Sequence, residues 1–332
     1  MLARVADSIY WMSRYVERAE NVARFIEVNL NLMLDSPVDS AQQWQPLIET
    51  TGDADEFAER YGAATQQNVI QFLTFDQENV NSIRSCLRAA RENARSVREV
   101  ISSEMWEKLN EFYLMVNSAD AETQTDPQEL FGSVKMASHL FTGVTNATMT
   151  HNEGWHFCRL GRMLERADKT SRILDVKYFL LLPSAADVGT TADDIQWAAV
   201  LRSTSAFEMY RKAHGRIAPE RVVEFLLFEN EFPRGIRYCL VRAREAVHAI
   251  SGTPTGIFRH PVERLLGELC SELAYARVET IIAGGLHEYL DRLQNRVNQV
   301  GTGISETFFA ARSAPPVRKK SRGRTTTPPF SV

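Results

Sequence analysis

The chain has 332 residues, of which 44% are hydrophobic, and its formal net charge is −4. This length allows one large or two medium domains, and the small net charge excludes the overall basic field typical of nucleic-acid-binding proteins. The four cysteines form no CxxC pair, so neither a disulfide framework nor a thiolate zinc site is indicated.

The first regular pattern is an amphipathic helix near the N-terminus. Its apolar side carries Met12, Tyr15, Val16, Ala19, Val22, Ala23 and Ile26. Its charged side carries Arg14, Glu17, Arg18, Asn21 and Arg24. Apolar residues at this 3.6-residue spacing predict a helix with one face turned to the core.

A second helical pattern follows in residues 80–101. Its apolar stripe consists of Val80, Ile83, Leu87, Ala90, Ala94, Val97 and Ile101. The opposite stripe consists of Arg84, Arg88, Arg91, Arg95 and Arg98. An arginine stripe without interleaved aromatic residues is a weak signal for nucleic acid. Residues 1–150 carry 12 Lys and Arg against 22 Asp and Glu, so neutralising this acidic first half is the simpler interpretation.

Later elements also read as helices. Pro233 and Pro261 stand where helices are expected to begin, because proline is tolerated in the first helical turn. From Pro261 the apolar spacing predicts helix to about Ile304, with a weak point at Gly284–Gly285. Only "VVEFLLF" (222–228) resembles a strand, so the predicted fold class is all-α.

The sequence repeats itself. Residues 14–28 ("RYVERAENVARFIEV") and 162–176 ("RMLERADKTSRILDV") are identical at six of fifteen positions. With an offset of 153, residues 69–92 match 222–245 at twelve positions, and Trp44 matches Trp197. A domain-sized period predicts an internally duplicated helical bundle with pseudo-twofold symmetry rather than a solenoid.

This duplication sets the predicted domain organisation. Residues 1–150 are the first helical repeat, and residues 151–310 are the second, packed with the first as one domain. Residues 311–332 form a basic tail rich in proline and threonine, a composition that predicts disorder and a solubilising role.

Four charged residues survive in both copies of the first repeated block. They are Arg14/Arg162, Glu17/Glu165, Arg18/Arg166 and Arg24/Arg172. A solvated surface needs charge but not arginine at a fixed place, whereas the planar fork of arginine suits two-pronged contacts with carboxylates or phosphates. The pattern therefore favours either an ion-pair lattice between two crossing helices or a polar cleft for an anionic ligand.

The cleft interpretation defines a set of candidate binding residues. Its members are Arg14, Glu17, Arg18, Arg24, Arg162, Glu165, Arg166 and Arg172, together with His156, Arg84, Arg91, Arg237 and Arg244. In such a cleft the arginines would hold the anion, and Glu17 or Glu165 would act as a base or metal ligand.

Two Glu-x-x-His pairs, Glu153/His156 and Glu245/His248, have the spacing found in di-iron bundles. On the helical wheel His156 points to the core, whereas Glu245 and His248 fall on the polar side. The pairs also do not match each other in the repeat, so we expect no metal and no cofactor. No phosphate-binding loop or nucleophile elbow is present in the sequence.

Several long segments, in order, resemble one known family. They are "SIYWMSRYVERAENVARF", "GWHFCRLGRMLERADKTSRILDVKYFLL", "WAAVLRSTSAFEMYRKAHG" and "FPRGIRYCL". They are similar to the bacterial alpha-E domain family, over residues 1 to about 310. One departure is Gly235, where the family commonly has serine.

The resemblance implies an all-helical fold, with the family's glutamate motif at Glu17 and Glu165. The resemblance also implies partner proteins, because members are associated with circularly permuted ATP-grasp amide ligases and with transglutaminase-like proteins. The function expected from it is that of a non-catalytic partner of such a ligase, binding the enzyme or its anionic peptide substrate. The alternative is an enzyme that acts on a peptide or acyl intermediate.

The sequence also bears on location. The N-terminus lacks the pattern of a signal peptide, and no apolar run approaches the length that spans a bilayer. We therefore expect a cytoplasmic protein that contacts neither membrane nor nucleic acid.

Overall fold

The computed structural model describes residues 1–35, 40–119, 127–180 and 191–310. Within these ranges every regular element is a helix, which confirms the all-α prediction. The proposed tail, 311–332, lies outside the described residues.

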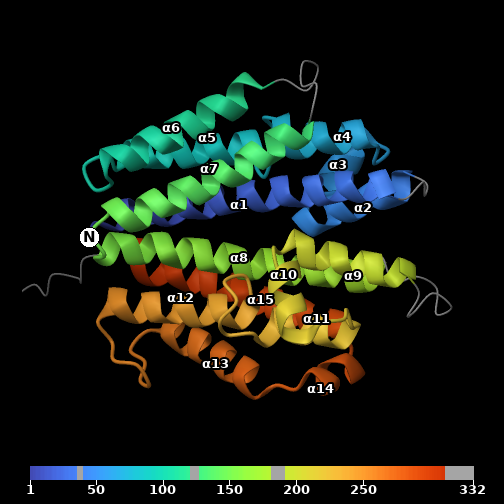
Figure 1. The fold of residues 1–332 in the computed structure, drawn as a ribbon. Helices are drawn as coiled ribbons and strands as arrows, with labels where there is room; N and C mark the ends of the chain where they lie inside the picture. The colour runs from blue at the N-terminus through green and yellow to red at the C-terminus, as the bar shows by residue number, and fades with distance from the viewer. Residues whose placement is uncertain (36–39, 120–126, 181–190, 311–332) are drawn as a thin grey trace, which may run out of the picture.

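The first half contains seven α-helices and one π-helical turn among its described residues (Figure 1). These elements are α1 (Ala3–Asp35), α2 (Ser40–Thr51), α3 (Ala54–Tyr61), α4 (Gln66–Ile70), η1 (Gln71–Phe75), α5 (Ile83–Ser96), α6 (Ser103–Ser118) and α7 (Pro127–Thr148).

The second half is also helical throughout its described residues. Its elements are α8 (Glu153–Leu180), α9 (Thr191–Ser203), α10 (Phe207–His214), α11 (Pro219–Phe228), α12 (Ile236–Ser251), α13 (Pro261–Tyr275), α14 (Val278–Ala283), α15 (Leu286–Ile304) and the π-helical turn η2 (Ser305–Phe309).

The two halves pack their helices in corresponding ways. The long helix α1 contacts α5 and α7, and α8 contacts α12 and α15. Between the halves α1 contacts α8 and α9, while α2 contacts α8. The buried hydrophobic residues of both halves form one continuous cluster, in which Trp44 and Trp197 both lie. A twofold relation between the halves stays a prediction, which superposing them would test.

Local sequence explains several helix boundaries. Pro261 is the first residue of α13, as predicted, whereas Pro233 lies three residues before α12 begins. The run 222–228 is part of α11, with Val222, Phe225 and Leu226 buried, so its apolar residues serve a helix and not a strand.

Two details of the sequence prediction are wrong. Val80 is 68% exposed and precedes α5, because the helix begins only at Ile83, after the Ser82 side chain has capped it. The predicted helix from Pro261 to Ile304 is divided not only at Gly284–Gly285 but also at Ala276, which is extended. This second break turns α14 so that Val278 and Ile281 are buried where α14 contacts α11.

Candidate functional site

The two repeated helices lie side by side and run in the same direction (Figure 1). At their N-terminal ends the amino group of Met1 is 2.8 Å from a carboxylate oxygen of Glu153. Their backbones approach closely at Gly161, where a Cβ atom would lie 2.4 Å from the carbonyl oxygen of Tyr10. This close approach brings the charged side chains of α1 and α8 within reach of each other.

The repeated glutamate and arginine of each copy pair with their counterparts in the other copy across this interface. Arg18 donates from Nε and Nη2 to the two carboxylate oxygens of Glu165, at 2.7 and 3.1 Å. Arg166 donates from Nε and Nη2 to those of Glu17, both at 2.8 Å. Each Glu–Arg unit therefore binds the other through paired, charge-assisted hydrogen bonds.

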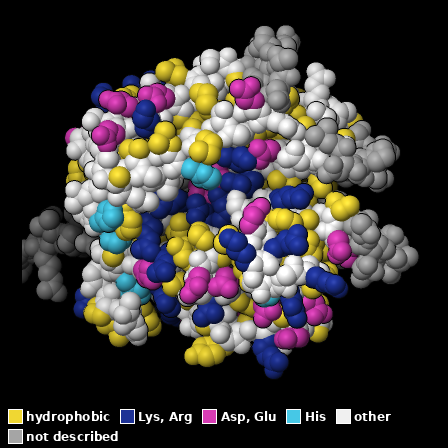
Figure 2. All heavy atoms as spheres, viewed as in Figure 1, with side chains coloured by type: hydrophobic (Ala, Val, Ile, Leu, Met, Phe, Trp, Pro, Cys, Tyr) yellow, Lys and Arg dark blue, Asp and Glu magenta, His cyan; other side chains and the backbone are white. Residues whose placement is uncertain are grey.

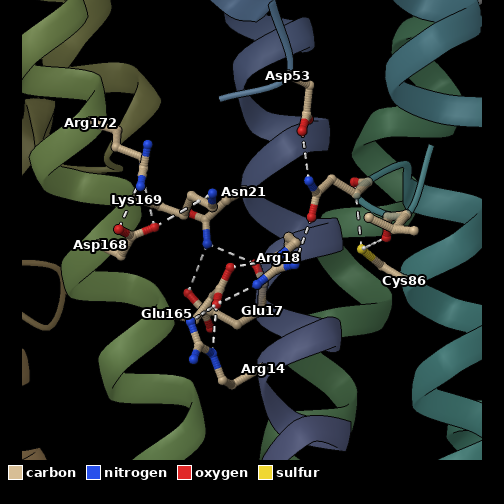
Figure 3. Close-up of polar contacts among 12 residues, drawn as sticks. Arg14, Glu17, Arg18, Asn21, Asp53, Cys86, Glu165, Asp168, Lys169 and Arg172 are labelled. Carbon is tan, nitrogen blue, oxygen red and sulfur yellow. Dashed lines mark hydrogen bonds and ion pairs between the residues drawn. The ribbon is translucent and has the colours of Figure 1, made fainter. Parts of the chain in front are cut away.

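Each glutamate is also held by a second arginine. Arg14 lies 2.8 Å (Nε) and 2.7 Å (Nη2) from Glu165, whose side chain is fully buried (Figure 3). On Glu17 the second arginine is Arg234, with Nη1 at 3.2 Å from Oε1. Each repeated glutamate thus contacts an arginine of the opposite copy, as in the ion-pair lattice that is one of the two arrangements favoured by the sequence.

Two further acidic residues extend the arrangement along the helices. Glu20 is fully buried and pairs with Arg24 and with Arg234, whose Nη2 lies 2.5 Å from Oε2 of Glu20. Nε2 of His139 in α7 lies 3.5 Å from Oε1 of the same glutamate. At the corresponding place in α8, Asp168 pairs with Arg172 at 3.0 Å (Figure 3).

Electrostatics hold the glutamates in their ionised form. Burial alone would raise the pKa of Glu17, but Arg166 and Arg234 hold it below its ordinary value. Burial is outweighed in the same way at Glu165, where Arg18 and Arg14 lower the pKa. A general base works best with a pKa near the ambient pH. Carboxylates already engaged by two guanidinium groups are thus poor bases and offer few free lone pairs to a metal.

Arg162 differs from every other charged residue of this interface. It occupies the place of Arg14 in the repeat, but the Glu17 carboxylate is taken by Arg166 and Arg234. Arg162 is partly buried and has no hydrogen bond or ion pair with any residue that the structure describes. Burial, and then the like charge of Arg166, lowers its pKa.

These contacts define a group that we call the Glu17 cluster. Its members are Glu17, Glu20, Arg24, Arg162, Arg166 and Arg234. It sets four guanidinium groups against two carboxylates and so holds a surplus of positive charge. Figure 2 shows Lys and Arg side chains gathered at the middle of this face, over α1 and α8, with histidine beside them. Such a surplus of positive charge is suited to an anion.

The remaining predicted arginines do not join the cluster. Arg84 donates to the carbonyl oxygen of Ala119 at 2.6 Å, and Arg91 donates to Asn110 at 2.7 Å, so both tie α5 to neighbouring segments. Arg237 and Arg244 lie on α12, and their positive charges partly offset the rise that burial causes in the pKa of Cys270 in α13. Among the described residues, none of these four arginines forms a hydrogen bond or ion pair with Glu17 or Glu165, which a helical wheel alone does not reveal.

The histidine predictions are partly corrected. His156 is half-buried beside Trp155, 5.1 Å between ring centroids, and its Nδ1 is buried without a partner among the described residues. His248 is buried and not on a polar face, because the chain after α12 folds back and places the Thr253 carbonyl oxygen 2.9 Å from Nδ1. Within the described residues no three His, Cys, Asp or Glu side chains are grouped to hold a metal ion.

Sequence reasoning did not select Arg234, Glu20, Asn21 or His139. In the second pair of repeated blocks, Asn81 of the first half corresponds to Arg234 of the second half. Each contacts a residue of a Glu-Arg unit: Asn81 accepts from Arg18 at 2.7 Å, and Arg234 donates to Glu17. The segment "FPRGIRYCL" was thus the available signal. Gly235 beside it fits tightly, since a Cβ atom there would lie 2.5 Å from the carbonyl oxygen of Glu229.

The fold and this interface define an all-helical protein built on reciprocal Glu–Arg pairs. Residues 1–309 match the model of the Alpha-E family, described as a predicted alpha-helical domain with a conserved ER motif, and the chain belongs to this family. The Glu-Arg units at Glu17 and Glu165 correspond to that description.

Similar curated proteins come from mycobacteria and are uncharacterised. One from Mycobacterium bovis and one from Mycobacterium tuberculosis are each 24% identical to this chain over 347 residues. The alignments cover 94% of this chain but 37% of the relatives, so the chain spans little more than a third of their length. No solved structure matches. In the described residues no helix has the length and apolar character needed to cross a bilayer.

Proposed function

We propose that this protein is a non-catalytic helical partner in an amide-bond-forming system of the ATP-grasp type. In this role the Glu17 cluster binds an anionic group of the peptide substrate or of the ligase. The single observation that carries the proposal is the guanidinium of Arg162, which has no hydrogen-bond or ion-pair partner in the described part of the chain, within a cluster that already has more arginines than carboxylates.

The physical reason is the cost of an isolated buried charge. A buried cation is costly unless an anion and hydrogen bonds compensate it. Arg14, at the corresponding place in the repeat, has such compensation from Glu165. Arg162 feels the charge of Glu17 but forms no hydrogen bond or ion pair with a described residue. A carboxylate or phosphate brought by a ligand would complete the cluster, and Arg162, which is partly and not fully buried, can be reached from solvent.

The proposed partner class rests on the family resemblance. The mycobacterial relatives are much longer than this chain, which leaves room in them for other domains. An all-helical domain that lacks a phosphate-binding loop suits substrate positioning better than nucleotide chemistry. The alternative is an enzyme that uses Glu17 or Glu165 as base or metal ligand. Both carboxylates are already bound by arginines, which disfavours either role.

The proposal is tested with an ATP-grasp-type ligase from the same organism. We expect a complex by size-exclusion chromatography with light scattering, and a changed product yield or length when this protein is added. Replacing Arg162 with Gln should reduce the effect on product, whereas Arg88→Gln, the same change on an exposed helix face, should not. ATP hydrolysis or peptide turnover by the isolated chain would contradict the proposal.

A further inference from the structure

A cavity of about 380 Å³ lies between α1, α8, α15 and η2. It is distinct from the Glu17 cluster, because no member of that cluster is among its lining residues. Its volume falls within the range of about 300–1,000 Å³ that is typical of small-molecule sites. Its lining includes Tyr10, Trp11, Arg14, Asn298, Ser305 and Phe309.

The walls of the cavity are largely aromatic. The ring centroids of Tyr10 and Phe309 are 5.4 Å apart, and the Arg14 guanidinium carbon lies 4.9 Å from the Trp11 ring centroid. Phe309 ends the π-helical turn η2, a kind of element that is frequent at functional sites. Such walls suit a flat apolar group.

The charge in the cavity comes from Arg14. Of the five N–H groups of an arginine, the one of Nε and one of the two of Nη2 bind Glu165, and one of the two of Nη1 donates to the Tyr10 hydroxyl at 3.1 Å. Two N–H groups remain, a number that matches the two oxygens of one carboxylate. Glu165 also forms an ion pair with Arg18, so one negative charge faces the two positive charges of Arg14 and Arg18, and one positive charge is in excess.

A glycine leaves Arg14 accessible from α15. At Gly301 a Cβ atom would lie 3.9 Å from Nη1 of Arg14, in ordinary contact. The backbone there does not require glycine, since its φ is not positive, and glycine is unfavourable inside a helix. A larger side chain at this position would fill the cavity in front of the guanidinium.

We propose that this cavity binds a small monocarboxylate with an aromatic or similarly sized apolar group. The carboxylate contacts Arg14, the apolar group lies among Tyr10, Trp11 and Phe309, and Asn298 and Ser305 offer further hydrogen bonds. A doubly charged phosphate is a poorer match, because one excess charge and two N–H groups would not compensate it. This site does not depend on the proposed ligase association.

The test uses 3-phenylpropionate as the probe and isothermal titration calorimetry as the assay. We expect saturable binding, with 3-phenylpropionamide at least about tenfold weaker, since it lacks the charge that strengthens hydrogen bonds to arginine. Gly301→Leu should weaken binding of the acid at least about tenfold. The matched control is Gly143→Leu on α7, where the added side chain meets open space; it should bind as the wild type does.

Three results would overturn the proposal. They are equal binding of acid and amide, unchanged binding by a folded Gly301→Leu variant, and no saturable binding by wild-type protein up to about 20 mM probe. Thermal melting of both leucine variants establishes that they are folded. The comparison of acid with amide uses unaltered protein, so it decides the question even if the leucine at position 301 prevents folding.

Discussion

Replacing Glu165 with Gln should destabilise the protein substantially. The Glu165 side chain is fully buried and compensates Arg14 and Arg18, whose side chains are only 15% and 16% exposed. Glutamine keeps the shape and one oxygen acceptor, but it removes the charge and turns an amide N–H₂ toward guanidinium donors. Two enclosed cations then lack an anion.

The magnitude follows from the burial. Removing one partner of a buried ion pair costs about 3–5 kcal/mol, and the remaining glutamine oxygen places the expected loss near the lower end, about 3 kcal/mol. At roughly 2–4 °C per kcal/mol for proteins of somewhat smaller size, Tm falls by about 6–12 °C. Glu245 provides a matched control, because it also accepts from two arginines, Arg159 and Arg242, but is 37% exposed.

The assay is urea unfolding followed by circular dichroism, with Tm from calorimetry. Glu245→Gln should change the free energy of unfolding by at most about 1 kcal/mol, as exposed ion pairs do. If Glu165→Gln loses no more than Glu245→Gln, the reciprocal pairs do not stabilise the interface of α1 and α8, and the reasoning is refuted.

Three other predictions concern the same interface. The pKa of Glu165 is held below its unfolded value of 4.5, so the ionised carboxylate contributes fully to stability above that pH, and the contribution is lost on acidification. The difference in unfolding free energy between wild type and Glu165→Gln, measured with urea, should therefore shrink as the pH falls from 5 to 3. An increase in this difference would contradict the prediction. Gly161→Ala should cost about 1–3 kcal/mol despite the better helix propensity of alanine, since the new Cβ meets the Tyr10 carbonyl oxygen; Gly143→Ala, in open space, should cost nothing by the same calorimetric assay. Arg162→Gln should leave Tm within about 2 °C of wild type or raise it, because no ion pair is lost and a like-charge contact disappears; a fall of more than about 6 °C would show that Arg162 has a stabilising partner.

The sequence predicted the fold class and the meeting of the two charged helix faces for definite physical reasons. Helical periodicity determines which side of α1 turns inward, and arginine and glutamate at the same places in both copies indicate that these side chains have partners. The buried contacts of Glu17 with Arg166 and of Glu165 with Arg18 are the outcome.

Other features depend on tertiary structure that periodicity does not contain. Arg234 comes from the segment before α12 and occupies Glu17 together with Arg166, and Arg162, unlike Arg14, has no ion pair with any described residue. His248 is buried because the chain after α12 folds back over it. The helix break at Ala276 follows from packing of α14 against α11, without a proline or glycine at that residue.

The central claim, that the Glu17 cluster is an anion-binding site and more than an ion-pair lattice, is tested most directly by titration of a short acidic peptide. Triglutamate binding is measured by calorimetry for wild type, Arg162→Gln and the exposed control Arg88→Gln. We predict binding that weakens at least about tenfold in Arg162→Gln, since one charge-assisted contact is lost, and that is unchanged in Arg88→Gln. Equal binding by all three proteins, or none by the wild type, would contradict the claim and leave the cluster a purely structural lattice.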